Sequence, residues 1–479
     1  MRNIKLTILA SVFFFVVLLC WAFAAPIGAG ADADFHISSI WCGQGEREGL
    51  CEERDVLAGS IQASVPFMFQ MCNGRPIEYL PNCPTIDAKP TTQFLRTAPP
   101  HQENAYYRLM SVFASKNTQR SILLIRSINA FIASAVLCAL LLVSRGKTRL
   151  AVATSWTIGL VPVAIQNFSS INPRGWSYLA VFASWAFLAA AIESPSRSSR
   201  AYFAYLFCIL SVALAFATRI DGSIFVIFSC ALVGASYALK SYVVSKKELY
   251  YSAASLIGIA MVFRSIPTIS KTFEFDFPSS IALPRFLLIQ LIHGPEFVAQ
   301  AWGYNVGQQG NGPGVIGVIG LSLFAITLAF SLKKSNPIQV VGVILISIFM
   351  MSALMRGSIA IGDVIPASGE YVMSLTVFLL GFSIWTSSSR QVFQVSRGGR
   401  IATISLLTFS HAVAFYSYME FYVKRGFELG TFKTISLKQQ WWWNSGISPD
   451  FVYWIACASF PVFLYFMWEM VISTSQDEQ

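Results

Sequence analysis

Charge is scarce in this sequence of 479 residues. Asp, Glu, Lys and Arg make up 12% of the side chains and 55% are apolar, whereas a soluble domain has about 25% charged residues. A soluble chain with so little charge could not cover its own surface. Disorder and nucleic-acid binding are excluded on the same ground, although the net charge is +10. The mean hydropathy of +0.57 therefore points to an all-α polytopic membrane protein with no nucleic-acid partner.

The motifs of several soluble enzyme classes are also missing. The sequence has no zinc-ligand spacing, P-loop, Rossmann fingerprint or G-x-S-x-G elbow, which argues against nucleotide hydrolysis by this chain. Only four histidines are present. His101 and His293 have no partner visible in the sequence, and we interpret each as a satisfied polar residue. His411 lies within an apolar run, where we expect it to hydrogen-bond a neighbouring helix.

Apolar segments of near-spanning length recur along the chain, and a spanning helix needs about 20 such residues. We count about twelve, near 6–25, 121–143, 150–166, 176–192, 201–217, 223–239, 249–264, 315–332, 337–355, 371–389, 401–419 and 451–471. The loop after each even-numbered segment up to the tenth is rich in Lys and Arg. Since basic residues gather in cytoplasmic loops, we expect these loops and both termini to be cytoplasmic.

Two segments admit a second interpretation. Residues 285–300, broken by Gly294-Pro295, are interpreted as an interfacial or re-entrant piece on the outer side, because a further span would invert the basic loops that follow. Residues 1–25 could be a cleaved signal peptide, with Ala22-Phe23-Ala24 as the cleavage site. The apolar run is long for that role, so we expect a retained first transmembrane helix.

The largest segment outside the membrane is 26–120, which we predict to be an extracytoplasmic loop domain, irregular and with short helices at most because of its prolines. Its four cysteines suggest two disulfides, and three pairings are possible. We favour the sequence-local pairs Cys42–Cys51 and Cys72–Cys83. Residues 121–479 then form the remaining transmembrane bundle, with outer loops 265–314 and 420–450. The run Trp441-Trp442-Trp443 is expected to anchor the last loop at the membrane interface.

An acidic motif, Asp32-Ala33-Asp34-Phe35-His36, lies directly outside the first span. A carboxylate at the bilayer surface could act as a general base on an acceptor hydroxyl. The pair Asp32 and Asp34 could also hold a divalent cation such as Mg²⁺ or Mn²⁺. The alternative is structural, with Asp32 or Asp34 as a helix N-cap, and the motif alone leaves both interpretations open.

Three arginines are expected near the same membrane face. Arg126 lies in the outer part of the second span, Arg174 follows Asn172-Pro173, and Arg219 stands two residues before Asp221. Arginines grouped in this way suit a lipid-linked phosphate, which they can bind through bidentate charge-assisted hydrogen bonds. The alternatives are snorkelling of Arg126 and Arg174 to lipid headgroups and a local salt bridge between Arg219 and Asp221.

Taken together, these features resemble the GT-C superfamily of membrane glycosyltransferases, which use polyprenyl-phosphate-linked sugars at the extracytoplasmic face. More narrowly, the chain resembles the bacterial family called domain of unknown function 2142. The motifs that carry this resemblance are Asp32-Ala33-Asp34-Phe35-His36 with Ile40-Trp41-Cys42, Ile171-Asn172-Pro173-Arg174-Gly175-Trp176, Arg219-Ile220-Asp221-Gly222, Trp302-Gly303 and Trp441-Trp442-Trp443.

The sequence departs from the family pattern at two places. Gly369-Glu370-Tyr371 has an acid where the family has Arg before Tyr, which changes a predicted substrate contact. Trp302-Gly303-Tyr304 continues into a run rich in Gly, Gln and Asn, where a more apolar segment containing an acid is expected. Both departures bear on the identity of the substrate.

The resemblance implies a GT-C-like bundle of about 12 transmembrane helices with a large first extracytoplasmic loop. It implies transfer of a hexosyl or pentosyl group from a polyprenyl-phosphate donor to a polysaccharide, lipid or protein acceptor of the cell envelope, with a divalent cation as the one cofactor considered. Asp32 or Asp34 would be catalytic. The candidate substrate-binding residues are His36, Arg126, Arg174, Arg219, Asp221, Glu370 and Tyr371. The alternatives are a lipid-linked sugar transporter or flippase, and a polysaccharide polymerase or ligase.

Overall fold

The computed structural model describes most of the chain. The described residues are 2–28, 33–57, 60–68, 91–97, 105–195, 197–240, 288–289, 292–293, 314–333, 335–361, 372–387, 396–424, 443 and 446–477. The predicted span 249–264 lies outside them, as does almost all of the segment 285–300.

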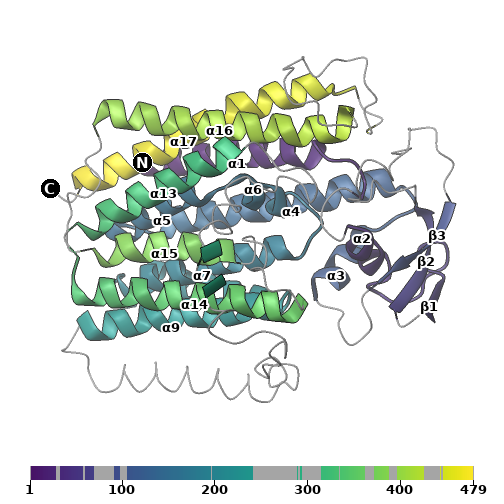
Figure 1. Cartoon of the computed structure of the whole chain (residues 1–479), viewed down its shortest axis with the longest axis horizontal. Coiled ribbons are helices and arrows are strands. Elements are labelled where there is room, and N and C mark those ends of the chain that lie inside the picture. The colour runs from purple at the N-terminus through teal and green to yellow at the C-terminus, as the bar shows by residue number, and fades with distance from the viewer. Residues whose placement is uncertain are drawn as a thin grey trace.

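Long apolar helices dominate the described chain (Figure 1). Within it, nine helices are long and apolar enough to cross a membrane, or ten if the bent pair α5 and α6 is one span. The chain is therefore a polytopic membrane protein. The helices of the bundle are α1 (Arg2–Phe23), α4 (Thr118–Val143), α5 (Gly146–Gly159), α6 (Pro162–Phe168), α7 (Arg174–Ile192), α8 (Ser199–Phe216), α9 (Ile220–Lys240), α13 (Gly314–Leu332), α14 (Pro337–Ile361), α15 (Met373–Thr386), α16 (Arg397–Lys424) and α17 (Pro449–Asp477).

Every predicted span that the structure describes contains one of these helices. Side-chain caps fix some of the boundaries. The Asn117 side chain accepts a hydrogen bond from the backbone N–H of Arg120 at the start of α4, and Ser198 accepts one from Ala201 at the start of α8. Such caps satisfy N–H groups that have no partner within the helix.

The prediction of one continuous span over 150–166 is wrong. Here the chain forms α5 and α6, which meet at an angle of 98°. Pro162 explains the break, because proline has no N–H to donate into the preceding turn and is well suited to the first position of a new helix. The backbone N–H of Val161 bonds to the carbonyl of Gly159, which closes a tight turn between the two helices.

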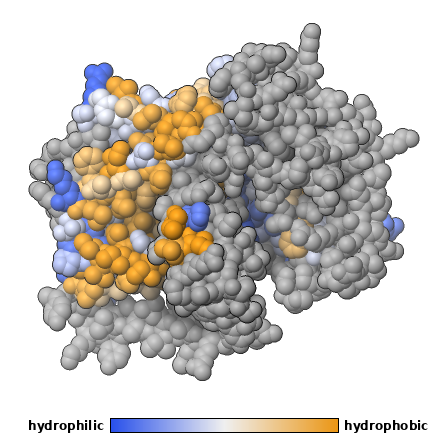
Figure 2. All heavy atoms as spheres, viewed as in Figure 1, coloured by the Kyte–Doolittle hydropathy of each residue, from blue (hydrophilic) through white to orange (hydrophobic). Residues whose placement is uncertain are grey.

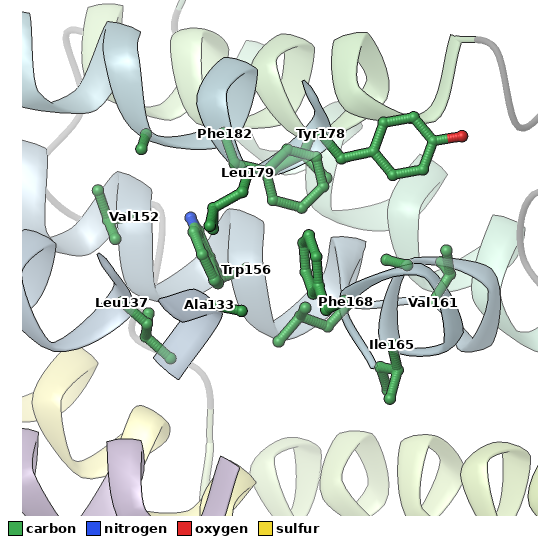
Figure 3. Close-up of a cluster of buried hydrophobic side chains, with 14 of the residues drawn as sticks. Ala133, Leu137, Val152, Trp156, Val161, Ile165, Phe168, Tyr178, Leu179 and Phe182 are labelled. Atoms are coloured by element: carbon green, nitrogen blue, oxygen red, sulfur yellow. The ribbon is translucent and has the colours of Figure 1, made fainter. Parts of the chain in front are cut away.

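The core of the bundle is built around α7 and α15, whose side chains are almost all buried. Aromatic rings fill the space between α5, α6 and α7 (Figure 3). Trp156 stacks on Phe168 with ring centroids 6.4 Å apart, and Phe182 meets both rings edge to face at 5.5 and 5.9 Å. These geometries are the preferred ones for aromatic pairs, and they hold the bent helix pair against α7.

Apolar side chains gather over much of the part of the bundle surface that is coloured in Figure 2. On α8 alone, Tyr202, Phe203 and Ile209 are each more than half exposed. Exposed apolar surface of this extent is costly in water and marks a membrane-facing surface, which agrees with the multi-pass arrangement.

One end of the bundle carries a small domain formed by part of the segment 26–120 (Figure 1). It contains α2 (Ala33–Trp41), α3 (Ala105–Met110) and a short 3₁₀ turn at Ser111–Phe113. It also contains an antiparallel sheet of β1 (Glu53–Leu57), β2 (Ser60–Met68) and β3 (Thr91–Arg96) in the order β1-β2-β3. The sheet corrects two predictions: the chain is not wholly α-helical, and this segment has more than short helices. Alternating residues in SIQASVPFM favour a strand despite the proline.

The two chain termini lie at the end of the bundle away from this small domain (Figure 1). Helix α1 packs against α17 and α4. Cys42 and Cys51 form a disulfide between sulfurs 2.01 Å apart, which is the first of the two predicted sequence-local pairs. Cys72 and Cys83 lie outside the described residues.

Candidate functional site

The acidic motif leads into helix α2. Asp34 lies in the first turn of this helix, while Asp32 and the Asp34 side chain are outside what the structure describes. His36 is buried, and its Nδ1 is 2.8 Å from the hydroxyl oxygen of Tyr107 on α3. This contact holds His36, the predicted substrate-binding residue of the motif, against the neighbouring helix, so α2 and α3 form one unit.

A buried hydrogen-bond network connects this unit to the bundle through Asn129 of α4. The Asn129 amide donates to the Tyr106 hydroxyl at 2.9 Å and to the Ser170 carbonyl at 2.6 Å, and its carbonyl accepts from the Trp176 indole at 2.9 Å. Burial raises the pKa of the Tyr106 phenol, so the hydroxyl stays protonated. Both N–H groups and the carbonyl of the Asn129 amide have hydrogen-bond partners. The side chain therefore joins α3, α4 and α7 rather than binding a ligand.

Arg126 holds the end of α1. One terminal nitrogen donates to the carbonyls of Ala22 and Ala25 at 3.0 and 2.6 Å, and the other donates to the carbonyl of Pro26 at 3.0 Å. A helix C-terminus leaves carbonyls without intrahelical partners and carries partial negative charge, so a buried guanidinium is favourable there. Arg126 thus fixes the point from which the chain leaves α1 toward the acidic motif.

Trp443 lies beside Arg126 at the end of α1. Its indole N–H donates to the carbonyl of Phe23 at 2.7 Å, and its ring lies 5.8 Å from the Arg126 guanidinium. The side chain is buried, so the expected role as an interface anchor is wrong for Trp443. The Arg126 guanidinium and the Phe23 carbonyl at the end of α1 provide a buried site that suits an indole better than the lipid interface does. Trp441 and Trp442 lie outside the described residues.

Arg219 and Asp221 form a bidentate pair where α8 ends and α9 begins. The Arg219 Nε lies 3.0 Å from one carboxylate oxygen of Asp221, and a terminal nitrogen lies 3.1 Å from the other. The backbone N–H of Gly222 also donates to this carboxylate at 2.9 Å. The local salt bridge considered from the sequence is therefore present, and about 30% of each side chain is exposed, 29% for Arg219 and 33% for Asp221.

Two further arginines lie close enough to Asp221 to interact with it electrostatically. Arg174 begins α7, is buried, and has its backbone N–H bonded to the Asn172 side chain at 2.9 Å. Arg356 lies near the end of α14. The group of Arg174, Arg219, Arg356 and Asp221, here called the arginine cluster, carries more positive than negative charge and comes from α7, the α8–α9 turn and α14.

Two glycines of the sequence motifs explain how these elements approach so closely. A Cβ at Gly175 would lie 2.3 Å from the Asn167 carbonyl oxygen, and a Cβ at Gly222 would lie 2.0 Å from the Ser177 hydroxyl oxygen. Both distances are far below a van der Waals contact. Glycine at these positions lets α6 approach α7 and lets α9 approach α7, which brings Arg174 near Asp221.

The chain is matched by the model of the family described as "Predicted membrane protein (DUF2142)" over residues 14–281, more than half of its length. The chain belongs to this family. No curated protein and no solved structure matches it. The narrower of the two resemblances seen in the sequence is thus confirmed, while the GT-C relationship stays a prediction.

The matched part of this DUF2142 protein contains the acidic motif, Arg126, Arg174, Arg219 and Asp221. Arg356 of α14 and Trp443, which lies between α16 and α17, come from later in the chain, and sequence reasoning missed both as site residues. The signal for Arg356 was a charge directly next to the predicted span 337–355, because a charge in or beside a span suggests function. Glu370 and Tyr371 lie outside the described residues.

The structure brings Arg174, Arg219 and Asp221 together, and it joins His36 to the bundle through the α2–α3 unit. Arg126 instead binds the end of α1 and lies beside Trp443. Among the described residues there is no group of three or more His, Cys, Asp or Glu side chains that could hold a metal ion. Asp32 and the Asp34 carboxylate are not among these residues.

Proposed function

We propose that this DUF2142 protein is a glycosyltransferase of the cell membrane, with a GT-C-like bundle, that transfers a sugar from a polyprenyl-phosphate donor to a cell-envelope acceptor. The observation that carries the proposal is the arginine cluster at the end of the bundle where α2, the helix that contains Asp34, lies. Its excess of positive charge suits a phosphodiester, because guanidinium groups bind phosphate oxygens through paired, charge-assisted hydrogen bonds.

The membrane orientation in this proposal follows the basic loops. The chain ends and the Lys- and Arg-rich loops face the cytoplasm, and the small domain with α2 and α3 faces the outside. A lipid-linked donor would then enter from the bilayer beside the cluster, while a polysaccharide, lipid or protein acceptor would approach from the extracytoplasmic side.

The reaction requires one proton acceptor and stabilisation of one leaving group. The acceptor hydroxyl oxygen attacks the anomeric carbon, and Asp32 or Asp34 takes the hydroxyl proton as a general base. The bond between the anomeric carbon and the phosphate oxygen breaks, and polyprenyl phosphate leaves with that electron pair, so the configuration inverts. Arg174 and Arg219 stabilise the charge that develops on the phosphate.

Arg126 has a positioning role in this mechanism. Its hydrogen bonds fix the carbonyls of Ala22, Ala25 and Pro26, which are only a few residues before Asp32. A base that is held in place loses less entropy in reaching the reactive geometry. Because carboxylate oxygens are preferred ligands of Mg²⁺ and Mn²⁺, Asp32 and Asp34 are the residues that would hold a divalent cation, which would neutralise phosphate charge.

A second function is favoured by a different observation, the break between α5 and α6. Broken helices beside buried polar groups are typical of membrane transporters. A cavity of about 20 Å³ adjoins this break and is lined by Leu160, Pro162, Ser410 and His411 among others. The Trp21 indole donates to Nε2 of His411 at 3.0 Å, as the sequence led us to expect. A flippase for lipid-linked sugars is therefore the second candidate.

Reconstituted vesicles separate the two candidates. The protein is incubated with a polyprenyl-phosphate-linked radiolabelled sugar and a cell-envelope acceptor fraction, and two quantities are followed: label transferred to the acceptor, and lipid-linked label moved between leaflets. We expect transfer to the acceptor without net translocation. Translocation without transfer would establish the flippase and overturn the enzyme.

A further inference from the structure

A second charged cluster lies at the opposite end of the bundle, where α5 begins and α7, α9 and α15 end. Its centre is Glu193, directly after α7. The Glu193 carboxylate accepts hydrogen bonds of 2.6 Å from the Thr148 hydroxyl of α5 and the Trp385 indole of α15. These two contacts draw the ends of three helices together.

Lysines from two helices converge on the same point. The Lys147 ammonium donates to the carbonyl of Ser387 at 2.8 Å, and the Lys240 ammonium lies 5.1 Å from the centre of the Trp385 ring. Both lie within electrostatic reach of Glu193 and of each other. Arg200 is also within reach of Glu193, and Arg145 is within reach of Arg200.

The charge of this basic cluster is unbalanced. Among its described members, four cations face one carboxylate, which leaves an excess of three positive charges. Like charges this close repel one another. The Lys147 ammonium has three N–H groups to donate, and the Ser387 carbonyl accepts a hydrogen bond from one of them. Arg145 and Lys240 are exposed, while Lys147 and Arg200 are half-buried. A bound anion would reduce the repulsion between these cations and could accept hydrogen bonds from their N–H groups at the surface.

The apolar surface next to the cluster indicates where that anion comes from. Leu239 and Leu142 are exposed beside Lys240 and Arg145, and Tyr202 and Phe203 are exposed just after Arg200. Charged side chains at the end of an exposed apolar helix face match a lipid, whose acyl chains cover the apolar face while its headgroup meets the cations. A soluble phosphate would gain nothing from the apolar residues.

We propose that Arg145, Lys147, Arg200 and Lys240 form a binding site for the phosphate headgroup of an anionic phospholipid, in which the Ser387 carbonyl positions Lys147 and the Trp385 ring positions Lys240. The site is independent of the proposed sugar transfer, since it lies at the other end of the bundle from the arginine cluster. Its occupant is a structural lipid of the boundary layer.

The test measures binding of phosphatidylglycerol and phosphatidylcholine to the detergent-purified full chain by native mass spectrometry. A Lys147→Gln/Lys240→Gln variant removes two charges of the cluster. The matched control, Lys5→Gln/Arg397→Gln, removes two exposed charges from α1 and α16, which carry no residue of the cluster. One basic residue at an anionic membrane surface contributes about fivefold in affinity, so losing two corresponds to roughly 30-fold.

We expect the wild-type protein to retain phosphatidylglycerol in preference to phosphatidylcholine, the cluster variant to lose roughly 30-fold in affinity, and the control to lose less than about threefold. A Lys147→Arg/Lys240→Arg variant should keep the lipid. Raising the salt to about 1 M, where the screening length is about 3 Å, should release lipid from the wild type, which tests the site without any substitution. Equal binding by the cluster variant and the control would overturn the proposal. Displacement of the lipid by millimolar inorganic phosphate alone would show that the cluster is a site for free phosphate and not for a lipid headgroup.

Discussion

The positioning role of Arg126 leads to a quantitative prediction. Arg126→Met keeps the length and apolar stem of the side chain but removes the charge and every N–H donor. Three hydrogen bonds to backbone carbonyls are lost. Each hydrogen bond to a charged group contributes a net stabilisation of about 1.5–3 kcal/mol, so the loss of three lowers the free energy of unfolding by at least about 4.5 kcal/mol before other effects are counted.

Two effects reduce that sum. The variant no longer has to desolvate a guanidinium, and this offsets part of the loss. Contacts that share one side chain are also not additive. We therefore expect the free energy of unfolding to fall by about 3 kcal/mol, with the loss centred on the end of α1 and the start of the acidic motif.

The assay is equilibrium unfolding of the purified protein in mixed micelles, followed by circular dichroism as the fraction of denaturing detergent rises. Arg120→Met is the matched control, because Arg120 is an exposed arginine on the same helix and should change stability by less than about 0.5 kcal/mol. If Arg126→Met and Arg120→Met unfold at the same detergent fraction, Arg126 does not hold α1, and a direct role in binding donor phosphate becomes the better account.

Three further predictions concern the neighbouring contacts. Arg219→Lys keeps the charge but loses the bidentate fork, so the KM for the polyprenyl-phosphate donor should rise with little change in acceptor KM; an unchanged donor KM would contradict this. Gly222→Ala places a Cβ against Ser177 and should destabilise by about 1–3 kcal/mol in thermal unfolding, whereas adding Ser177→Gly should restore most of the loss. Replacing Cys42 and Cys51 together by Ser should lower stability by about 2–3 kcal/mol, and a reducing agent should lower the wild type equally and leave the variant unchanged.

Much of the bundle could be predicted because membrane spans are defined by apolar length. Every predicted segment that the structure describes contains a helix, from α1 to α17. The break at Leu160–Val161 was missed because an apolar run is read as continuous even when Pro162 interrupts its hydrogen bonds. The strands were missed because the prolines of the segment 26–120 were given more weight than the alternation of apolar residues in SIQASVPFM.

The site was predictable in its residue types more than in its contacts. Arg174, Arg219 and Asp221 were identified because charges at the ends of spans are costly and therefore informative. Their meeting with Arg356 depends on the packing of α7, α9 and α14, which residue spacing does not encode. The partners of Arg126 are backbone carbonyls, and no sequence pattern identifies which carbonyls a distant side chain will reach.

The central claim, that a carboxylate of the acidic motif is the general base, is tested most directly by Asp32→Asn and Asp34→Asn. Asn caps a helix about as well as Asp but cannot accept a proton, so both variants should fold. The measurement is the rate of sugar transfer from a polyprenyl-phosphate donor in vesicles, alongside thermal unfolding of each variant. We predict that one variant keeps wild-type stability and loses roughly 10²–10⁴ in rate; wild-type turnover in both variants would remove the carboxylates from the mechanism.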